Sequence, residues 1–429
     1  MLMIRNTVLA LGIWLLSGFG LTVGAGANDA GLERAGLALT TLDGLGNIGQ
    51  YTSVTVGADG LGLISYHDVT NRSLKVAHCS NQACTSATLT TLDNTGEVGQ
   101  STSVTIGTDG LGLISYYDVT NRNLKVAHCS NQACTSATLA TLDDTGDVGQ
   151  DTAVTIGADG LGLISYHDVT NGNLKVAHCS NQACTSATLT ALDDTGEVGQ
   201  DTSVTIGADR LGLISYYDAT NGNLKVAHCA NRACTAATLT TLDSAGDVGQ
   251  YTSVTIGTDG LGLISYHDAT NHNLKIAHCS NQACTSATLT TLDNTGKVGQ
   301  DTSVTIGADG LGLISYHDVA NRNLKVAHCS NQACTSATLA TLDNTGEVGQ
   351  DTSVTIGADG LGLISYHDMA NGALKIAHCS DLSCVPAATE RLSMTGSHRA
   401  KKPVTGWLSV KKKKNSATAE REPLRNGNF

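Results

Sequence analysis

Aromatic side chains are scarce in this chain of 429 residues, in which Trp, Tyr and Phe together make up 3%. The apolar residues are mainly Leu, Val, Ile and Ala. A core assembled from small and β-branched side chains favours strands over helices. We therefore expect an all-β fold class.

Basic side chains are also sparse before residue 390. The formal net charge is −13, although the tail holds ten basic residues against three glutamates. The remaining 15 basic and 35 acidic side chains give residues 1–389 a net charge of −20. Because nucleic-acid binding requires clustered positive charge, this acidic body predicts no nucleic-acid partner.

Long apolar runs are missing except at the N-terminus. Arg5 precedes an apolar run over residues 8–23, and Ala25-Gly26-Ala27 follows as a small-residue cleavage site. This pattern predicts a secretory signal peptide over residues 1–27, with an uncleaved membrane anchor as the alternative. We expect a secreted protein, extracellular or periplasmic, with no membrane span after cleavage.

One stretch of fifty residues organises the rest of the chain. Residues 51–100 read YTSVTVGADGLGLISYHDVTNRSLKVAHCSNQACTSATLTTLDNTGEVGQ, and this text returns with a few changes per copy and no insertion at 101, 151, 201, 251, 301 and 351. Seven copies in strict register indicate one supersecondary unit stacked on itself.

Each unit contains four strand-like runs separated by turn signals, over residues 52–57, 61–68, 74–79 and 87–93 in the first copy. A four-stranded antiparallel meander repeated seven times is typical of a seven-bladed β-propeller, with a β-solenoid as the main alternative. Blades pack face to face, which explains why residues 61–64 (LGLI) are continuously apolar. We assign residues 28–393 to this propeller.

The ring must also close. Residues 37–43 (LALTTLD) repeat the fourth strand before the first blade, whereas the matching residues 387–393 (AATERLS) are degraded. We infer that the N-terminal strand completes the seventh blade. Residues 394–429 are basic, with a run of four lysines from Lys411 to Lys414, and are expected to be a disordered tail.

Two cysteines flank the third turn of every copy. Paired cysteines at fixed spacing in an exported protein predict disulfides, one across this hairpin in each blade. Each small ring should add about 2 kcal/mol to the free energy of unfolding. The predicted pairs are Cys79 and Cys84, Cys129 and Cys134, Cys179 and Cys184, Cys229 and Cys234, Cys279 and Cys284, Cys329 and Cys334, and Cys379 and Cys384.

The copies differ most at three polar or aromatic positions, numbered 51, 67 and 72 in the first unit. They are expected in the loops after the second and fourth strands, on one face of the propeller. Variation there suits a binding surface, and it suits neutral drift equally well. The candidate ligand-binding residues are Tyr51, His67, Arg72, Tyr117, Arg122, His167, Tyr217, Tyr251, His267, His272, His317, Arg322 and His367.

Other polar residues recur in every copy and are predicted to be structural. His78 and its equivalents follow the period of an apolar strand and are expected to be hydrogen-bonded within the fold. A carboxylate beside a Thr-Asn turn most simply accepts hydrogen bonds from the N–H groups of that turn. This role falls to Asp68, Asp118, Asp168, Asp218, Asp268, Asp318 and Asp368.

No metal or cofactor is predicted, although the acidic loops leave calcium open as an alternative, best seen in Asp143, Asp144, Asp147 and Asp151. An enzyme needs an asymmetric set of side chains aimed at one point. No blade departs from the repeat in that way, so the chain is predicted not to be an enzyme.

The unit TSVTIGADGLGLISYHD…NLKVAHC resembles the blades of bacterial secreted propellers in the broad sialidase-like, BNR-repeat class. The resemblance covers residues 37–393 and implies a propeller fold and export. The unit lacks the Ser-x-Asp-x-Gly-x-Thr-Trp box and has no matching arginine triad, so the resemblance does not imply sialidase activity.

These observations together predict an exported, non-catalytic, monomeric recognition module. Its first predicted partner is a glycan on the loop face of the propeller, where Tyr and His rings would stack on sugars. Repeated weak sites would combine through multivalency. The alternative is a scaffold for an extracellular or envelope protein, and a sialidase-like glycoside hydrolase is a third hypothesis.

Overall fold

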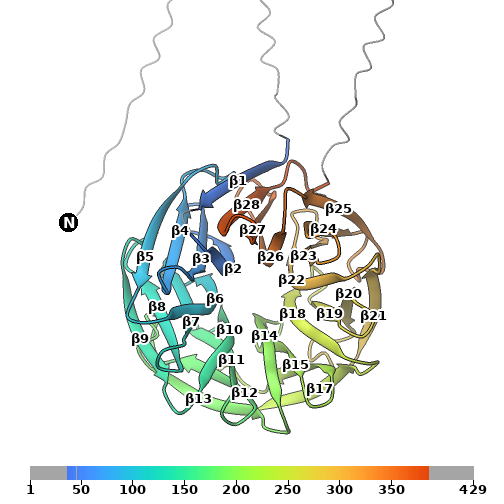
Figure 1. The fold of residues 1–429 in the computed structure, drawn as a ribbon. Helices are drawn as coiled ribbons and strands as arrows, with labels where there is room; N and C mark the ends of the chain where they lie inside the picture. Colours follow the sequence, from blue (N-terminus) through green and yellow to red (C-terminus); the bar gives the residue numbers. More distant parts are fainter. Residues whose placement is uncertain (1–35, 45, 386–429) are drawn as a thin grey trace, which may run out of the picture. The chain divides into compact units, whose positions relative to one another are not determined.

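The computed structural model describes residues 36–44 and 46–385, which form seven four-stranded antiparallel sheets around a central axis (Figure 1). The all-β, seven-bladed propeller is thereby confirmed. The predicted signal peptide at 1–27 and the predicted tail at 394–429 lie outside the described residues, as do residues 387–393.

Each blade runs from an inner strand at the axis to an outer strand at the rim. The inner strands are β2 (Ile48–Val56), β6 (Val98–Ile106), β10 (Val148–Ile156), β14 (Val198–Ile206), β18 (Val248–Ile256), β22 (Val298–Ile306) and β26 (Val348–Ile356). The second strands are β3 (Gly62–Asp68), β7 (Gly112–Asp118), β11 (Gly162–Asp168), β15 (Gly212–Asp218), β19 (Gly262–Asp268), β23 (Gly312–Asp318) and β27 (Gly362–Asp368). The third strands are β4 (Ser73–Cys79), β8 (Asn123–Cys129), β12 (Asn173–Cys179), β16 (Asn223–Cys229), β20 (Asn273–Cys279), β24 (Asn323–Cys329) and β28 (Ala373–His378). The outer strands are β1 (Ala38–Asp43), β5 (Ala87–Asp93), β9 (Ala137–Asp143), β13 (Ala187–Asp193), β17 (Ala237–Asp243), β21 (Ala287–Asp293) and β25 (Ala337–Asp343).

The last blade takes its outer strand from the beginning of the chain. Strand β1 pairs antiparallel with β28, with Ala38 opposite His378 and Thr41 opposite Lys375, in a sheet of order β1-β28-β27-β26 (Figure 1). The two ends of the described chain therefore meet in one sheet.

The hydrophobic core is divided among the seven interfaces between blades. At the first interface, Leu63 and Val76 of one blade pack with Val104 and Ile114 of the next. A Cβ atom at Gly62 would lie 2.8 Å from both Cys79 Sγ and Leu363 Cδ2, the latter in the preceding blade. The second strand is therefore apolar along its length because a neighbouring blade covers each of its faces.

A buried carboxylate at the end of each outer strand ties its blade to the next. Asp93 Oδ2 accepts hydrogen bonds from Tyr116 Oη at 2.8 Å and from Lys125 Nζ at 2.5 Å. Burial alone would raise the pKa of Asp93, but hydrogen bonds from Lys125, Thr95 and Tyr116 outweigh it and lower the pKa to about 2. The carboxylate is thus ionised and pairs with the lysine across the interface.

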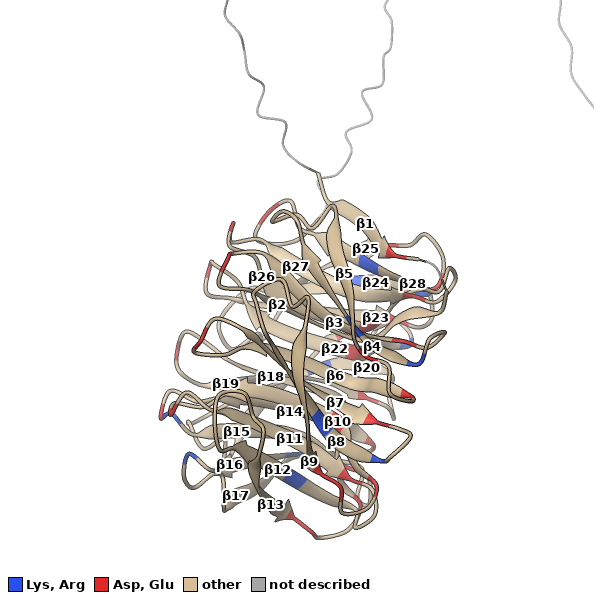
Figure 2. Ribbon diagram, turned by 90° about the vertical axis from the view of Figure 1, so that its left-hand side faces the viewer, with Lys and Arg blue, Asp and Glu red and all other residues tan. Residues whose placement is uncertain are grey.

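All seven predicted disulfides are present, one in each blade, with Cα–Cα distances of 4.8–4.9 Å. Many acidic residues lie in the loops at the two edges of the ring (Figure 2). The described part of the chain contains no helix that could cross a membrane.

Candidate functional site

A bulge in the inner strand of every blade aims one side chain at the axis. In the first blade Gln50 pairs with His67 and Ser53 with Ser65, so Tyr51 and Thr52 together oppose a single residue. Such bulges bend a strand and redirect its side chains. The first bulge residue has a positive φ of 49–53° in all seven blades, at Tyr51, Ser101, Asp151, Asp201, Tyr251, Asp301 and Asp351.

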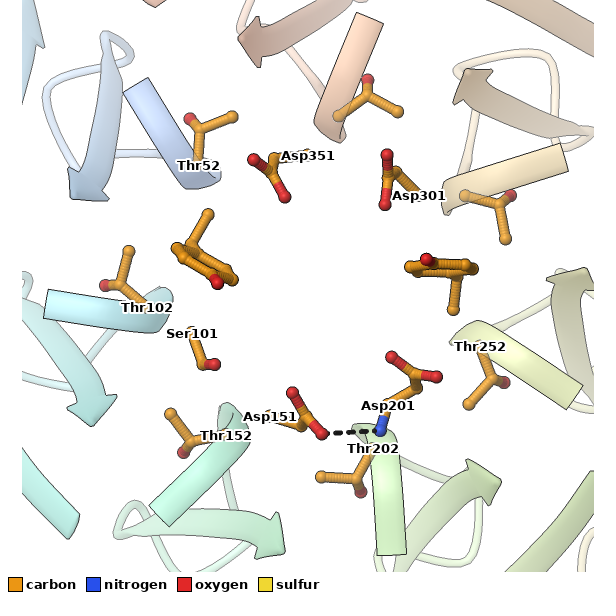
Figure 3. Close-up of a pocket in the computed structure, with 14 residues that line it drawn as sticks. Thr52, Ser101, Thr102, Asp151, Thr152, Asp201, Thr202, Thr252, Asp301 and Asp351 are labelled. Carbon is orange, nitrogen blue, oxygen red and sulfur yellow. Dashed lines mark hydrogen bonds between the residues drawn. The ribbon is translucent and has the colours of Figure 1, made fainter. Parts of the chain in front are cut away.

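A positive φ is costly for residues other than glycine, and it persists only where the surrounding structure enforces it. Here the enforced conformation brings seven side chains from across the sequence to one place. They surround a cavity of about 230 Å³ on the axis, completed by the following residue of each blade: Thr52, Thr102, Thr152, Thr202, Thr252, Thr302 and Thr352 (Figure 3).

The bulge residues that line this cavity differ from blade to blade. Asp151 and Asp201 lie side by side at one edge, and Asp301 and Asp351 lie together at the opposite edge (Figure 3). Tyr51, Tyr251 and Ser101 complete the ring of bulge residues. The cavity therefore combines two pairs of carboxylates with two phenol rings and the hydroxyl group of Ser101.

A backbone amide holds one of the carboxylates in place. The N–H of Asp201 donates to Asp151 Oδ2 at 3.2 Å (Figure 3). This bond joins the third blade to the fourth and leaves the remaining lone pairs of Asp151 for a ligand.

Burial and mutual repulsion raise the pKa values of these carboxyl groups. Burial, with the charge of Asp151 added, raises the pKa of Asp201 to about 7. Burial raises the pKa of Asp351 to about 6, and it also raises those of Asp151 and Asp301. Some of the four groups consequently carry protons near neutral pH. Burial, with nearby carboxylates, raises the pKa of Tyr51 to about 12, so this phenol stays neutral.

The structure places the residues at position 67 behind this ring and not on the surface. His67 is 1% exposed, with its ring centroid 6.3 Å from that of Tyr51, and Tyr217, at 7%, is the most exposed of the seven residues. The expectation that His67, Tyr117, His167, Tyr217, His267, His317 and His367 present their rings to a sugar is therefore corrected. Their strands are covered by a blade on each side, and the ring centroid of His267 likewise lies 6.1 Å from that of Tyr251.

The imidazoles of four of these histidines are neutral. Burial lowers the pKa values of His67, His317 and His367, and it lowers that of His267 to about 4. Both ring nitrogens of His67, His317 and His367 lack a hydrogen-bond partner. In contrast, Tyr117 donates its hydroxyl to Asp147 at 2.7 Å.

Position 72 remains on the surface, in the turn between the second and third strands. Arg72, Arg122, His272 and Arg322 have positive φ values of 54–60° there, and Arg322 lies 3.6 Å from Glu347. None of these four residues is among those that line the axial cavity. Of the thirteen candidate ligand-binding residues, the cavity contains Tyr51 and Tyr251.

The recurring Asp and His residues have partners within their own blades. Asp68, 1% exposed, accepts hydrogen bonds from the backbone N–H and side-chain Nδ2 of Asn71 at 2.9 and 2.8 Å. His78 Nε2 lies 2.8 Å from Asp59 Oδ2. The other Asp residues of the set bond the same way to the Asn of their turns: Asp118, Asp168, Asp218, Asp268, Asp318 and Asp368.

Residues 36–44 and 46–385 contain no group of three or more His, Cys, Asp or Glu side chains arranged to hold a metal ion. Calcium binding and the absence of a cofactor both stay predictions.

Sequence reasoning missed Ser101, Asp151, Asp201, Asp301 and Asp351 as members of one site. The sequence does contain a signal for this site, because position 51 is Tyr, Ser or Asp in different copies. What the sequence does not reveal is the bulge, which turns this position toward the axis and makes seven distant residues neighbours.

No protein-family model matches the chain, and no curated protein matches it. Among solved structures it is similar to the NanB sialidase of Streptococcus pneumoniae, at 10% identity and a TM-score of 0.46 over 78% of this chain and 68% of that one. It is also similar to an α-L-arabinofuranosidase of Fusarium graminearum, at 10% identity and a TM-score of 0.47 over 80% and 98% of the two chains. A polysaccharide lyase, Uly1, has 9% identity and a TM-score of 0.47 over 76% and 89%. At these identities the likeness concerns the propeller fold alone, and the BNR-repeat class stays a prediction.

The prediction that the chain is not an enzyme is contradicted. It excluded catalysis because no blade carries an unusual set of acids, yet the structure collects two carboxylate pairs from four blades on the axis. The sequence argument against catalysis therefore fails, because four aspartates do meet in one cavity.

Proposed function

We propose that this protein is a carbohydrate-binding propeller and that its sugar site is the axial cavity. The observation that carries the proposal is the convergence of seven bulge residues and seven threonines on one cavity of about 230 Å³. Ligand pockets usually enclose about 300–1,000 Å³ for drug-sized molecules, so this one suits a single sugar ring or the end of a glycan chain.

The side chains around the cavity match the chemistry of sugar recognition. Carboxylates and the hydroxyl group of Ser101 can accept hydrogen bonds from sugar hydroxyls. Tyr51 and Tyr251 offer apolar ring surface with a polar hydroxyl, the combination that suits the two faces of a sugar. The geometry favours one composite site made by all blades over seven independent weak sites on the loop face.

The seven disulfides support an oxidising compartment, and we propose that the protein acts outside the cytosol.

A glycan array of the oxidised protein, with calcium and with EDTA, tests the sugar site when the wild type is compared with Ser101→Tyr. Tyrosine is compatible with this backbone, because Tyr51 and Tyr251 have the same positive φ at the equivalent position. The added ring should fill the cavity and abolish binding, whereas Asn94→Tyr on an exposed loop should leave it unchanged. Equal binding by both variants would place the sugar elsewhere and refute the proposal.

Glycoside hydrolysis at the same cavity is a second candidate. Two nearby carboxyl groups, one protonated and one ionised, are the usual apparatus for cleaving a glycosidic bond. Asp201, with its pKa raised to about 7 by burial, could donate a proton while Asp151 remains the base or nucleophile. The test is the release of reducing ends from glycans that bind, with Asp201→Asn losing turnover and the exposed-loop variant Asp194→Asn retaining it. Intact glycans after incubation with wild type would exclude this candidate.

A further inference from the structure

The axial cavity carries negative charge that the protein does not balance. Four of its fourteen lining residues are aspartates, and none is lysine, arginine or histidine. Both carboxylate pairs face the same small space from opposite edges (Figure 3). Like charges held this close destabilise one another unless protons or an external cation compensate them.

Basic groups elsewhere in the described blades are engaged away from the axis. The lysine of every third strand binds the carboxylate at the end of a neighbouring outer strand, as Lys125 binds Asp93. Arg322 is exposed in its turn and lies beside Glu347. No compensating cation therefore reaches the ring from these strands and turns.

His317, packed directly behind the ring, does not supply charge either. His317 is 2% exposed, both its nitrogens lack a hydrogen-bond partner, and its Nδ1 lies 3.9 Å from Asp301 Oδ2. Burial lowers the pKa of His317, so the ring is neutral. A neutral imidazole aimed at a cavity carboxylate can exchange a hydrogen bond with a polar ligand, but it cannot neutralise the carboxylate.

We propose that the axial cavity selects an amino sugar, a polyhydroxylated ligand that carries a protonated primary amine. The inference rests on the sugar site proposed above and specifies its ligand class. The ammonium group would lie between the carboxylates of one pair, such as Asp151 and Asp201, and the sugar hydroxyls would bond to the other carboxyl groups of the ring. Acidic sugars are excluded by the same charge, because their carboxylate would meet four aspartates and no basic residue.

Three matched probes separate the contributions of the amine and the sugar. Calorimetry with the oxidised full chain would use triglucosamine, tri-N-acetylglucosamine, in which acetylation removes the charge, and spermidine, which has amines but no sugar. We expect triglucosamine to bind at least about tenfold more tightly than its acetylated form, because hydrogen bonds to charged groups contribute about 1.5–3 kcal/mol. The preference should shrink at high salt.

The double variant Asp151→Asn with Asp201→Asn should lose this preference. Asparagine has the same shape as aspartate and keeps one side-chain oxygen that accepts hydrogen bonds, so the main change is the loss of charge. Asp194→Asn removes the same charge on an exposed loop and should keep the preference. Asp301→Asn, in the opposite pair, repeats the test should the double variant fail to fold.

The outcomes distinguish the two proposals. Equal affinity for the charged and acetylated trisaccharides overturns the amino-sugar inference and leaves the sugar site standing. Binding of spermidine without either trisaccharide overturns both proposals. Retention of the preference in both the Asp151→Asn, Asp201→Asn variant and the Asp301→Asn variant also overturns the inference, because the amine would then lie outside both carboxylate pairs.

Discussion

Tyr66 donates its hydroxyl to Asp43 Oδ2 at 2.9 Å, and this bond joins the first blade to the last. Asp43 ends β1, which belongs to the sheet of β26, β27 and β28. The same bond joins Tyr116 to Asp93 and Tyr366 to Asp343 at other interfaces. The interface that closes the ring therefore has the same polar contact as the interfaces formed by consecutive blades.

Removing the Asp43 carboxylate should destabilise the interface between the last blade and the first. Asp43→Ala deprives Tyr66 and Lys75 of their shared acceptor, and both donors lie at the interface between blades. Breaking such a buried pair should lower the free energy of unfolding by about 3 kcal/mol. Denaturant unfolding measures the change, with Asp194→Ala on an exposed loop as the control. Equal stability of the two variants would show that the contact does not hold the ring.

A single blade should depend on its disulfide to a measurable but limited extent. Cys129→Ala with Cys134→Ala removes one small ring, and loop-entropy arithmetic gives a loss of about 2 kcal/mol in the free energy of unfolding. The folded structure should be retained, because the six other bridges remain and the other residues of the core cluster that contains Cys129 and Cys134 are unchanged. A variant that is fully unfolded in native buffer would contradict this estimate.

The carboxyl groups of the cavity should make stability depend on pH. The pKa of Asp201 is raised from 3.8 to about 7, so the folded state holds this proton more tightly than the unfolded state does. The stabilisation is present at low pH and is lost as the pH rises from about 4 to about 7. The neutral histidines behind the ring act in the opposite direction, since protonating them below pH 6.5 opposes folding.

A variant isolates the effect of one carboxyl group from that of the histidines. Asp201→Asn should be more stable than wild type at pH 8, by about 1–2 kcal/mol after allowance for solvent screening, and equally stable near pH 4. Chemical unfolding at both pH values measures the difference. A variant that is less stable than wild type at pH 8 would show that the carboxylate is not destabilising.

The phenol ring of Tyr51 should contribute to sugar binding through its face. Tyr51→Ser, which copies the residue of the second blade at the same backbone conformation, should weaken binding by about three- to tenfold. Tyr51→Phe keeps the ring and should bind nearly as well as wild type. Equal losses in the two variants would instead assign the contribution to the hydroxyl group.

The fifty-residue repeat predicts most of the fold. Four strand-like runs, the apolar residues at 61–64 and the paired cysteines predict blades, two-sided burial and disulfides, and each is present. The copy of the fourth strand at 37–43 points to the place where β1 pairs with β28. These features are local or periodic, and local patterns are what a sequence displays most directly.

The site depends on relationships that are not local. His67 was assigned to the surface because polar loop residues usually lie there, but the blades that bury Leu63 and Ile64 also cover the far end of the same strand. Asp151 and Asp301 line the same cavity because a bulge in each inner strand turns them inward. Neither the burial of His67 nor the bulge has a sequence signature of its own.

The measurement that tests the account most directly is a crystal structure of the protein grown with triglucosamine. We predict electron density for a sugar ring in the axial cavity, within hydrogen-bond distance of a carboxylate pair and against Tyr51 or Tyr251. Sugar density at the turns that carry Arg72 and its equivalents, or an empty cavity at saturating ligand, would contradict the assignment of the axial cavity as the binding site.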